Sequence, residues 1–127
     1  LNFPRFLPDN YIEKNEKIKI YKRALALKTF EELEDLHKEL EDRFGRLKSE
    51  AKGFFEFLKI RIRARELGIV SIKEDKEKRL LINFNEKKIN VDKIIYLLAN
   101  KKISYLKFTQ TIGFEGDIFE FFDLYSN

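Results

Sequence analysis

The sequence predicts one α+β domain: a helical N-terminal half of about three helices, packed on a small, mostly antiparallel sheet, with two further short helices. The first half carries apolar residues at helical spacing. The second half alternates like paired strands around a charged turn. A length of 127 residues, of which 43% are hydrophobic, suits one domain with its own core. We expect residues 1–12 to be an extended lead-in and residues 13–127 to form the single domain.

The first predicted helix covers residues 13–27. Its apolar residues Ile18, Tyr21 and Leu25 repeat at i, i+3 and i+7, which predicts that they face the core. The basic character of the helix comes from Lys17, Lys19, Lys22, Arg23 and Lys28.

The second predicted helix covers residues 30–44 and has clear signals at both ends. Thr29 and Glu32 have the spacing of a capping box, in which side chains satisfy free backbone N–H groups. Gly45 directly after the segment favours a helix end.

The third predicted helix covers residues 49–67. Residues 58–64 alternate between apolar and basic side chains, which is strand periodicity. The charged side chains Lys52, Glu56 and Lys59 nevertheless fall on one stripe when the segment is wound as a helix. We therefore predict a helix that is largely buried.

The second half is predicted to contain a hairpin, a helix, a strand and a final helix. The ranges are 69–72 and 80–84 for the hairpin strands, about 92–99 for a helix capped by Asp92, 103–111 for a strand ended by Gly113, and 118–125 for a helix opened by Asp117.

The composition argues against a catalytic or metal site. No Cys is present, which excludes disulfides and thiolate metal ligands. The five glycines never have a phosphate-binding spacing. His37 is the only histidine, and no Ser or Cys stands at helical spacing from it. We therefore expect no enzyme activity, no cofactor and no bound metal.

The chain also lacks an apolar run of the roughly 20 residues that a membrane helix needs. We expect no membrane partner, a cytoplasmic location and a monomeric chain. Because the sequence contains no Met, we expect it to be part of a longer protein.

The net charge of +4 is too modest to indicate nucleic-acid binding by itself. The candidate phosphate contacts are interleaved with acidic residues, which favours ordinary solubility. They are Lys76, Lys78, Arg79, Lys87, Lys88, Lys101 and Lys102.

The second predicted helix carries an acidic face opposite its apolar stripe. The face consists of Glu31, Glu32, Asp35, Glu39, Asp42 and Arg43. Glu39 and Arg43 are four residues apart with the acid first, so they can pair within the helix. Such a face would complement a basic protein surface and repel DNA. The alternative is a helix surface that contacts only water.

Four motifs in a fixed order resemble the C-terminal domain of the bacterial transcription-repair coupling factor family. They are Pro-Asp-Asn-Tyr-Ile at 8–12, Tyr-Lys-Arg at 21–23, Glu-Leu-Glu-Asp-Arg-Phe-Gly at 39–45, and Ala-Arg-Glu-Leu-Gly-Ile at 64–69. Their spacing agrees with the family from residue 8 to about residue 84. The last third of the chain agrees mainly in the order of its elements.

This resemblance implies a noncatalytic regulatory domain within an ATP-dependent DNA translocase. In the family, other domains bind DNA and RNA polymerase. The C-terminal domain masks an N-terminal module that binds the damage-recognition subunit of the excision nuclease. The family's contact residues fall on Glu39, Asp42 and Arg43, and Asp35 and Glu32 extend the same face. The alternative hypothesis is an accessory nucleic-acid-binding domain of such a translocase.

Overall fold

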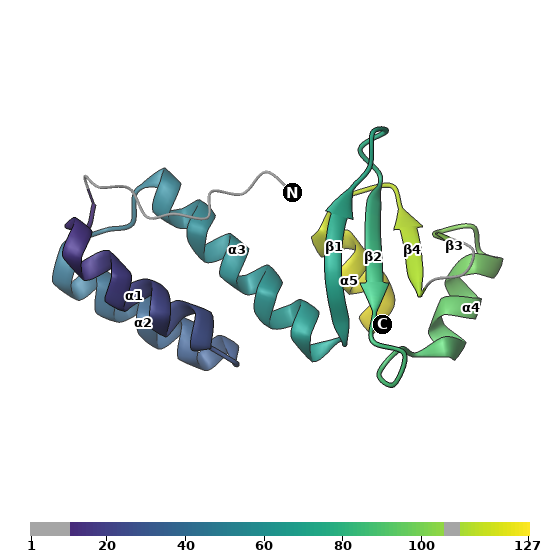
Figure 1. Cartoon of the computed structure of the whole chain (residues 1–127), viewed down its shortest axis with the longest axis horizontal. Coiled ribbons are helices and arrows are strands. Elements are labelled where there is room, and N and C mark those ends of the chain that lie inside the picture. The colour runs from purple at the N-terminus through teal and green to yellow at the C-terminus, as the bar shows by residue number, and fades with distance from the viewer. Residues whose placement is uncertain (1–10, 106–109) are drawn as a thin grey trace. The chain divides into compact units, whose positions relative to one another are not determined.

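The computed structural model describes residues 11–105 and 110–127, which form five helices and an antiparallel sheet (Figure 1). The predicted α+β class is therefore confirmed. The chain divides into two compact units, one within residues 2–62 and one within residues 63–127. The single domain over residues 13–127 stays a prediction. Residues 1–10 of the predicted lead-in lie outside the described residues.

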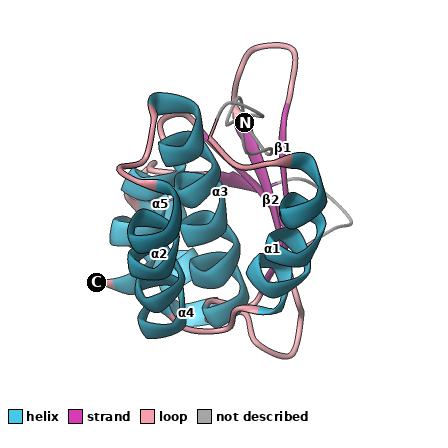
Figure 2. Cartoon of the chain, turned by 90° about the vertical axis from the view of Figure 1, so that its left-hand side faces the viewer, coloured by secondary structure: helices cyan, strands magenta, loops and turns pink. Residues whose placement is uncertain are grey.

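The first unit is helical, as predicted, and its helices are drawn in cyan in Figure 2. It contains α1 (Lys14–Ala26), α2 (Phe30–Phe44) and most of α3 (Ser49–Glu66). At the start of α2, the Thr29 hydroxyl oxygen accepts a hydrogen bond from the Glu32 backbone N–H at 3.1 Å. The predicted cap is thus present, although the Glu32 carboxylate bonds the Thr29 hydroxyl instead of a backbone N–H.

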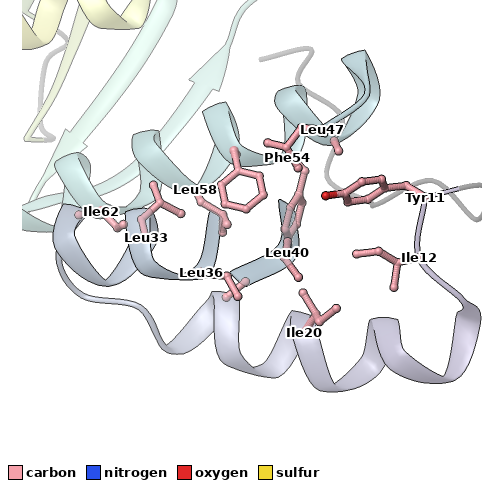
Figure 3. Close-up of a cluster of buried hydrophobic side chains, with 13 residues drawn as sticks. Tyr11, Ile12, Ile20, Leu33, Leu36, Leu40, Leu47, Phe54, Leu58 and Ile62 are labelled. Carbon is pink, nitrogen blue, oxygen red and sulfur yellow. The ribbon is translucent and has the colours of Figure 1, made fainter. Parts of the chain in front are cut away.

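A core of buried apolar side chains holds the three helices together (Figure 3). Leu36 and Leu40 of α2 face Phe54 and Leu58 of α3 within this cluster. Phe54, Leu58 and Ile62 repeat every four residues, which is the spacing of one helix face. Burial of this face explains why residues 58–64 form a helix despite their alternating pattern.

The predicted core stripe of α1 is confirmed for Tyr21, which packs against the core, and is wrong for Ile18 and Leu25. Ile18 and Leu25 are 59% and 51% exposed, whereas Ile20 and Ala24 are buried. The reason is Lys17, which is only 9% exposed and occupies a position of the buried stripe. A lysine can bury its aliphatic stem while its ammonium group reaches a polar partner, so a charged residue can hide a core position.

The second unit contains a four-stranded sheet in the order β1-β2-β4-β3, with every neighbouring pair antiparallel. The strands are β1 (Ile69–Glu74), β2 (Leu80–Phe84), β3 (Ser104–Tyr105) and β4 (Thr111–Phe114). The predicted hairpin is confirmed as β1 and β2. The single strand predicted over residues 103–111 is wrong, because β3 and β4 are separate strands that pair with each other, and Gly113 lies inside β4. Residues 106–109 lie outside the described residues.

Two short helices complete this unit, α4 (Val91–Ala99) and α5 (Ile118–Ser126). The predicted cap of α5 is confirmed, since the Asp117 carboxylate accepts a hydrogen bond from the Phe119 backbone N–H at 3.0 Å. The cap of α4 is Asn90 instead of Asp92. The Asn90 side-chain oxygen accepts a hydrogen bond from the Lys93 backbone N–H at 3.1 Å. Aromatic rings from α5 pack on the sheet. Phe121 lies 5.5 Å from Phe114, and Tyr125 lies 4.9 Å from Phe84.

Candidate protein-interaction surface

The six residues of the predicted acidic face all lie on α2. Five of them are exposed and Glu39 is half-buried. The structure separates Glu39 and Arg43, at the flank of the helix toward α1, from the acids opposite the buried residues Leu36 and Leu40. Glu39 and Arg43 are bonded to side chains of α1. Asp35 and Asp42 are two helical turns apart and point to one side, which we call the outer face.

Glu39 and Arg43 of α2 form an ion-pair network with Arg23 and Glu16 of α1. Arg23 donates two hydrogen bonds to Glu39, from Nη2 to Oε1 at 3.0 Å and from Nη1 to Oε2. The Arg43 Nη1 lies 3.5 Å from Glu39 Oε2, which confirms the predicted pair within the helix. The Arg43 Nη2 donates to Glu16 Oε2 at 3.2 Å. Two carboxylates and two guanidinium groups leave the network with no net charge.

The pKa values within the network follow from these bonds. Hydrogen bonding from Arg23 is the largest cause that lowers the pKa of Glu39 below its ordinary value, and the charges of Arg23 and Arg43 add to it. The same hydrogen bond raises the pKa of Arg23. The side chains of Arg23 and Glu39 are 49% and 38% exposed. Solvent therefore limits the stabilisation from this pair to about 1 kcal/mol or less.

The Arg43 guanidinium has a third contact. Its central carbon lies 4.8 Å from the centre of the Phe44 ring, within the range of a cation–π interaction. Together with the two carboxylates, the ring restricts where this guanidinium can point. Arg43 is therefore a fixed positive group beside the acidic residues.

Glu31, Asp35 and Asp42 are exposed acids on the outer face of the helix. None of the three carboxylates has a hydrogen bond or ion pair with any residue within 11–105 or 110–127. Glu32 differs, because its carboxylate accepts the Thr29 hydroxyl hydrogen bond at 3.2 Å and so belongs to the start of the helix. The negative charge that is free to attract a partner thus lies on the outer face.

The sequence did not identify the α1 residues of the network. Arg23 is part of the Tyr-Lys-Arg motif, but the motif indicates no partner for it, and Glu16 belongs to none of the four motifs. Their partners are 16 and 27 residues away along the chain. Such pairs depend on how two helices pack, which the periodicity of one helix does not reveal.

His37 lies on the side of α2 that faces α3. Its ring is 5.0 Å from the ring of Phe55, and its Nε2 is 3.3 Å from the Glu41 carboxylate. This arrangement contains no nucleophile for the imidazole to activate. Among the residues that the structure describes, no three His, Cys, Asp or Glu side chains are grouped to hold a metal ion.

The basic candidates are divided over the second unit. Arg79, Lys101 and Lys102 line one surface pocket, together with Glu115 and Glu120. Arg79 is held by Asp75, whose carboxylate accepts from the Arg79 Nε at 2.9 Å. Burial opposes ionisation of Asp75, but hydrogen bonds from the backbone and guanidinium of Arg79 outweigh it and lower the pKa of that carboxyl. The pocket is therefore of mixed charge. No helix within the described ranges is long and apolar enough to cross a membrane.

Comparisons with known proteins agree with the motifs. The family model described as TRCF domain matches residues 1–94. The transcription-repair-coupling factor of Escherichia coli K12 is 36% identical in an alignment 122 residues long that covers 89% of this chain and 10% of that protein. The namesake from Borreliella burgdorferi is 33% identical over 100 residues, or 77% of this chain and 9% of that protein. The chain thus spans about a tenth of the length of these relatives.

A solved structure supports the same fold. The crystal structure of the C-terminal domain of transcription-repair coupling factor superposes with a TM-score of 0.75. The match covers 98% of this chain and 84% of that chain at 20% sequence identity, so it bears on the fold alone. Together with the family model, which covers most of the sequence, the relatives confirm the resemblance drawn from the motifs. The chain belongs to the TRCF domain family and is a domain of a transcription-repair coupling factor.

Proposed function

We propose that this domain is a noncatalytic module that masks another part of its own full-length protein. The masked part is the N-terminal module that binds the damage-recognition subunit of the excision nuclease. In this proposal ATP-dependent DNA translocation and RNA polymerase binding belong to other domains, and the protein acts in the cytoplasm. The observation that carries the proposal is the exposed Asp42, which has no partner within residues 11–105 and 110–127, beside the fixed guanidinium of Arg43.

This arrangement suits docking onto a basic protein surface. A partner cation that approaches Asp42 does not have to break an ion pair with any residue that the structure describes. The helix that carries the carboxylate is anchored on its opposite side by Leu36 and Leu40, so the face is presented on a rigid element. The neighbouring Arg43 and Glu39 add one donor and one acceptor of known position, which favours one docking register over others.

The energy that such a mask needs is small. Two modules of one polypeptide meet at an effective concentration that can reach the order of millimolar. Moving an equilibrium from 1:99 to 99:1 takes about 5.5 kcal/mol. Keeping 99% of molecules closed therefore needs a closed state that is only about 2.7 kcal/mol more stable than the open state. Removing one partner of a charge pair that is buried in an interface costs about 2–5 kcal/mol. A single substitution that costs more than about 2.7 kcal/mol, which lies within this range, is therefore enough to open most molecules.

The experiment uses the full-length protein and measures its affinity for the damage-recognition subunit. We expect Glu39→Ala and the double change Asp42→Ala, Arg43→Ala to raise that affinity, and Glu39→Lys to raise it further by adding repulsion. Glu34→Ala is the matched control, since Glu34 is an exposed acid on the α3 side of the same helix. If the folded variants bind no better than wild type, the face contacts only water and the proposal fails.

A second candidate is an accessory nucleic-acid-binding domain. It is favoured by one observation, the meeting of Arg79, Lys101 and Lys102 in one pocket. Two carboxylates in that pocket oppose it. Binding of this chain to duplex DNA should weaken steeply with salt if several phosphates are contacted. The masking proposal expects poor DNA binding even at low salt.

A further inference from the structure

The proposed mask rests on residues of α2, but two of those residues are held by α1. The Glu39 carboxylate receives both hydrogen-bonding arms of Arg23, and Arg43 is bonded to Glu16. A glutamate on a helix surface otherwise samples several rotamers. The planar fork of an arginine fixes both oxygens of a carboxylate at once, so the carboxylate here has a defined plane and direction.

This order extends to Arg43. Glu39 Oε2 is bonded to Arg23 and also lies 3.5 Å from the Arg43 Nη1. The position of the Glu39 carboxylate therefore helps to set the position of the Arg43 guanidinium. Loss of Arg23 would leave the charge of Glu39 in place and remove the group that orients it.

We propose that Arg23 is a positioning residue for the masking contact, so that the docking surface is built from α1 and α2 together. The inference rests on the proposed function. A side chain that is already ordered loses less conformational entropy when a partner docks on it. In this view Arg23 strengthens the mask through Glu39, without needing to touch the masked module itself.

The opposite role for Arg23 has a different signature. Its guanidinium also neutralises Glu39, so it competes with any cation of the masked module. If competition dominated, removing Arg23 would free Glu39, tighten the mask and lower the affinity for the damage-recognition subunit. Positioning predicts that removal raises this affinity. We favour positioning because Asp42, which has no partner among the described residues, already supplies an uncompensated charge for the cation.

The test measures binding of the purified damage-recognition subunit to full-length variants. We expect Arg23→Ala to raise the affinity between about 1.4-fold and fivefold, the range of an exposed charge pair. In the Glu39→Ala background the same change should have no further effect, because Arg23 acts through Glu39. Arg23→Lys keeps the charge but not the fork, so it should behave like Arg23→Ala. Lys22→Ala, a neighbouring exposed cation of α1, is the control and should match wild type.

Several results would overturn the inference. They are a lower or unchanged affinity for Arg23→Ala, an additive effect on Glu39→Ala, or full recovery by Arg23→Lys. A thermal melt checks that each variant is folded. If Glu39→Ala opens the mask and Arg23→Ala does not, only the role of Arg23 is refuted. If neither Glu39→Ala nor the Asp42, Arg43 double change has an effect, the masking function itself is refuted.

Discussion

The corrected core of α1 can be tested with two isoleucines of the same helix. Ile20 is 1% exposed and belongs to the hydrophobic cluster of the helical unit, whereas Ile18 is 59% exposed. Truncation of a fully buried isoleucine to alanine removes its transfer energy and leaves a cavity, which together cost about 2–5 kcal/mol. We expect Ile20→Ala to cost at least about 2 kcal/mol and Ile18→Ala less than about 0.5 kcal/mol.

The assay is urea unfolding of the 127-residue chain followed by the helical circular dichroism signal. The helical unit supplies α1, α2 and most of α3, so its loss dominates that signal. A shift of the midpoint at constant slope reports a change in stability. Equal costs for the two variants, or a larger cost for Ile18→Ala, would refute the buried stripe of Lys17, Ile20 and Ala24 and restore the stripe expected from the sequence.

Three further predictions concern two glycines, the titration of Glu39 and the absence of ATP hydrolysis. Gly68→Ala should lower the free energy of unfolding more than Gly45→Ala. Both glycines have a positive φ, so both substitutions strain the backbone. Only at Gly68 would the added Cβ also clash, because it would lie 2.5 Å from the Lys88 Cβ, whereas no atom lies within 4 Å of an added Cβ at Gly45. The Glu39 carboxyl should titrate below the ordinary value of about 4.3 in an NMR titration and return toward it in Arg23→Ala. The stabilisation by this pair is then present above the ordinary pKa and is lost as the pH falls through the lowered value. The purified chain should hydrolyse no ATP, and activity that survives rigorous purification and co-elutes with the chain would contradict a noncatalytic domain.

Much of the fold could be predicted because its signals are local. Thr29 and Asp117 mark helix starts through hydrogen bonds to backbone groups two or three residues away. The hairpin of β1 and β2 joins neighbouring segments of the chain. The wrong predictions concern features that depend on contacts between residues far apart in the sequence. Lys17 is buried although its charge favours the surface, and β3 is a separate strand that pairs with β4.

The candidate site divides in the same way. The charged side of α2 follows from the periodicity of one helix, and the pair of Glu39 with Arg43 follows from their spacing. The packing of α1 against α2 determines that Arg23 neutralises Glu39, whereas Asp42 has no partner in the described part of the chain. Charge counted along the sequence therefore overstated how much of the acidic face is available to a partner.

The masking claim is tested most directly by titrating the isolated N-terminal recruitment module into this chain. With an effective concentration of about 1 mM in the intact protein, a 99% closed state requires a Kd of about 10 µM or tighter between the separate parts. We expect saturable binding in that range by calorimetry, weakened at least tenfold by the Asp42→Ala, Arg43→Ala double change and unaffected by Glu34→Ala. No binding at hundreds of micromolar, or equal binding by the double variant, would contradict the mask.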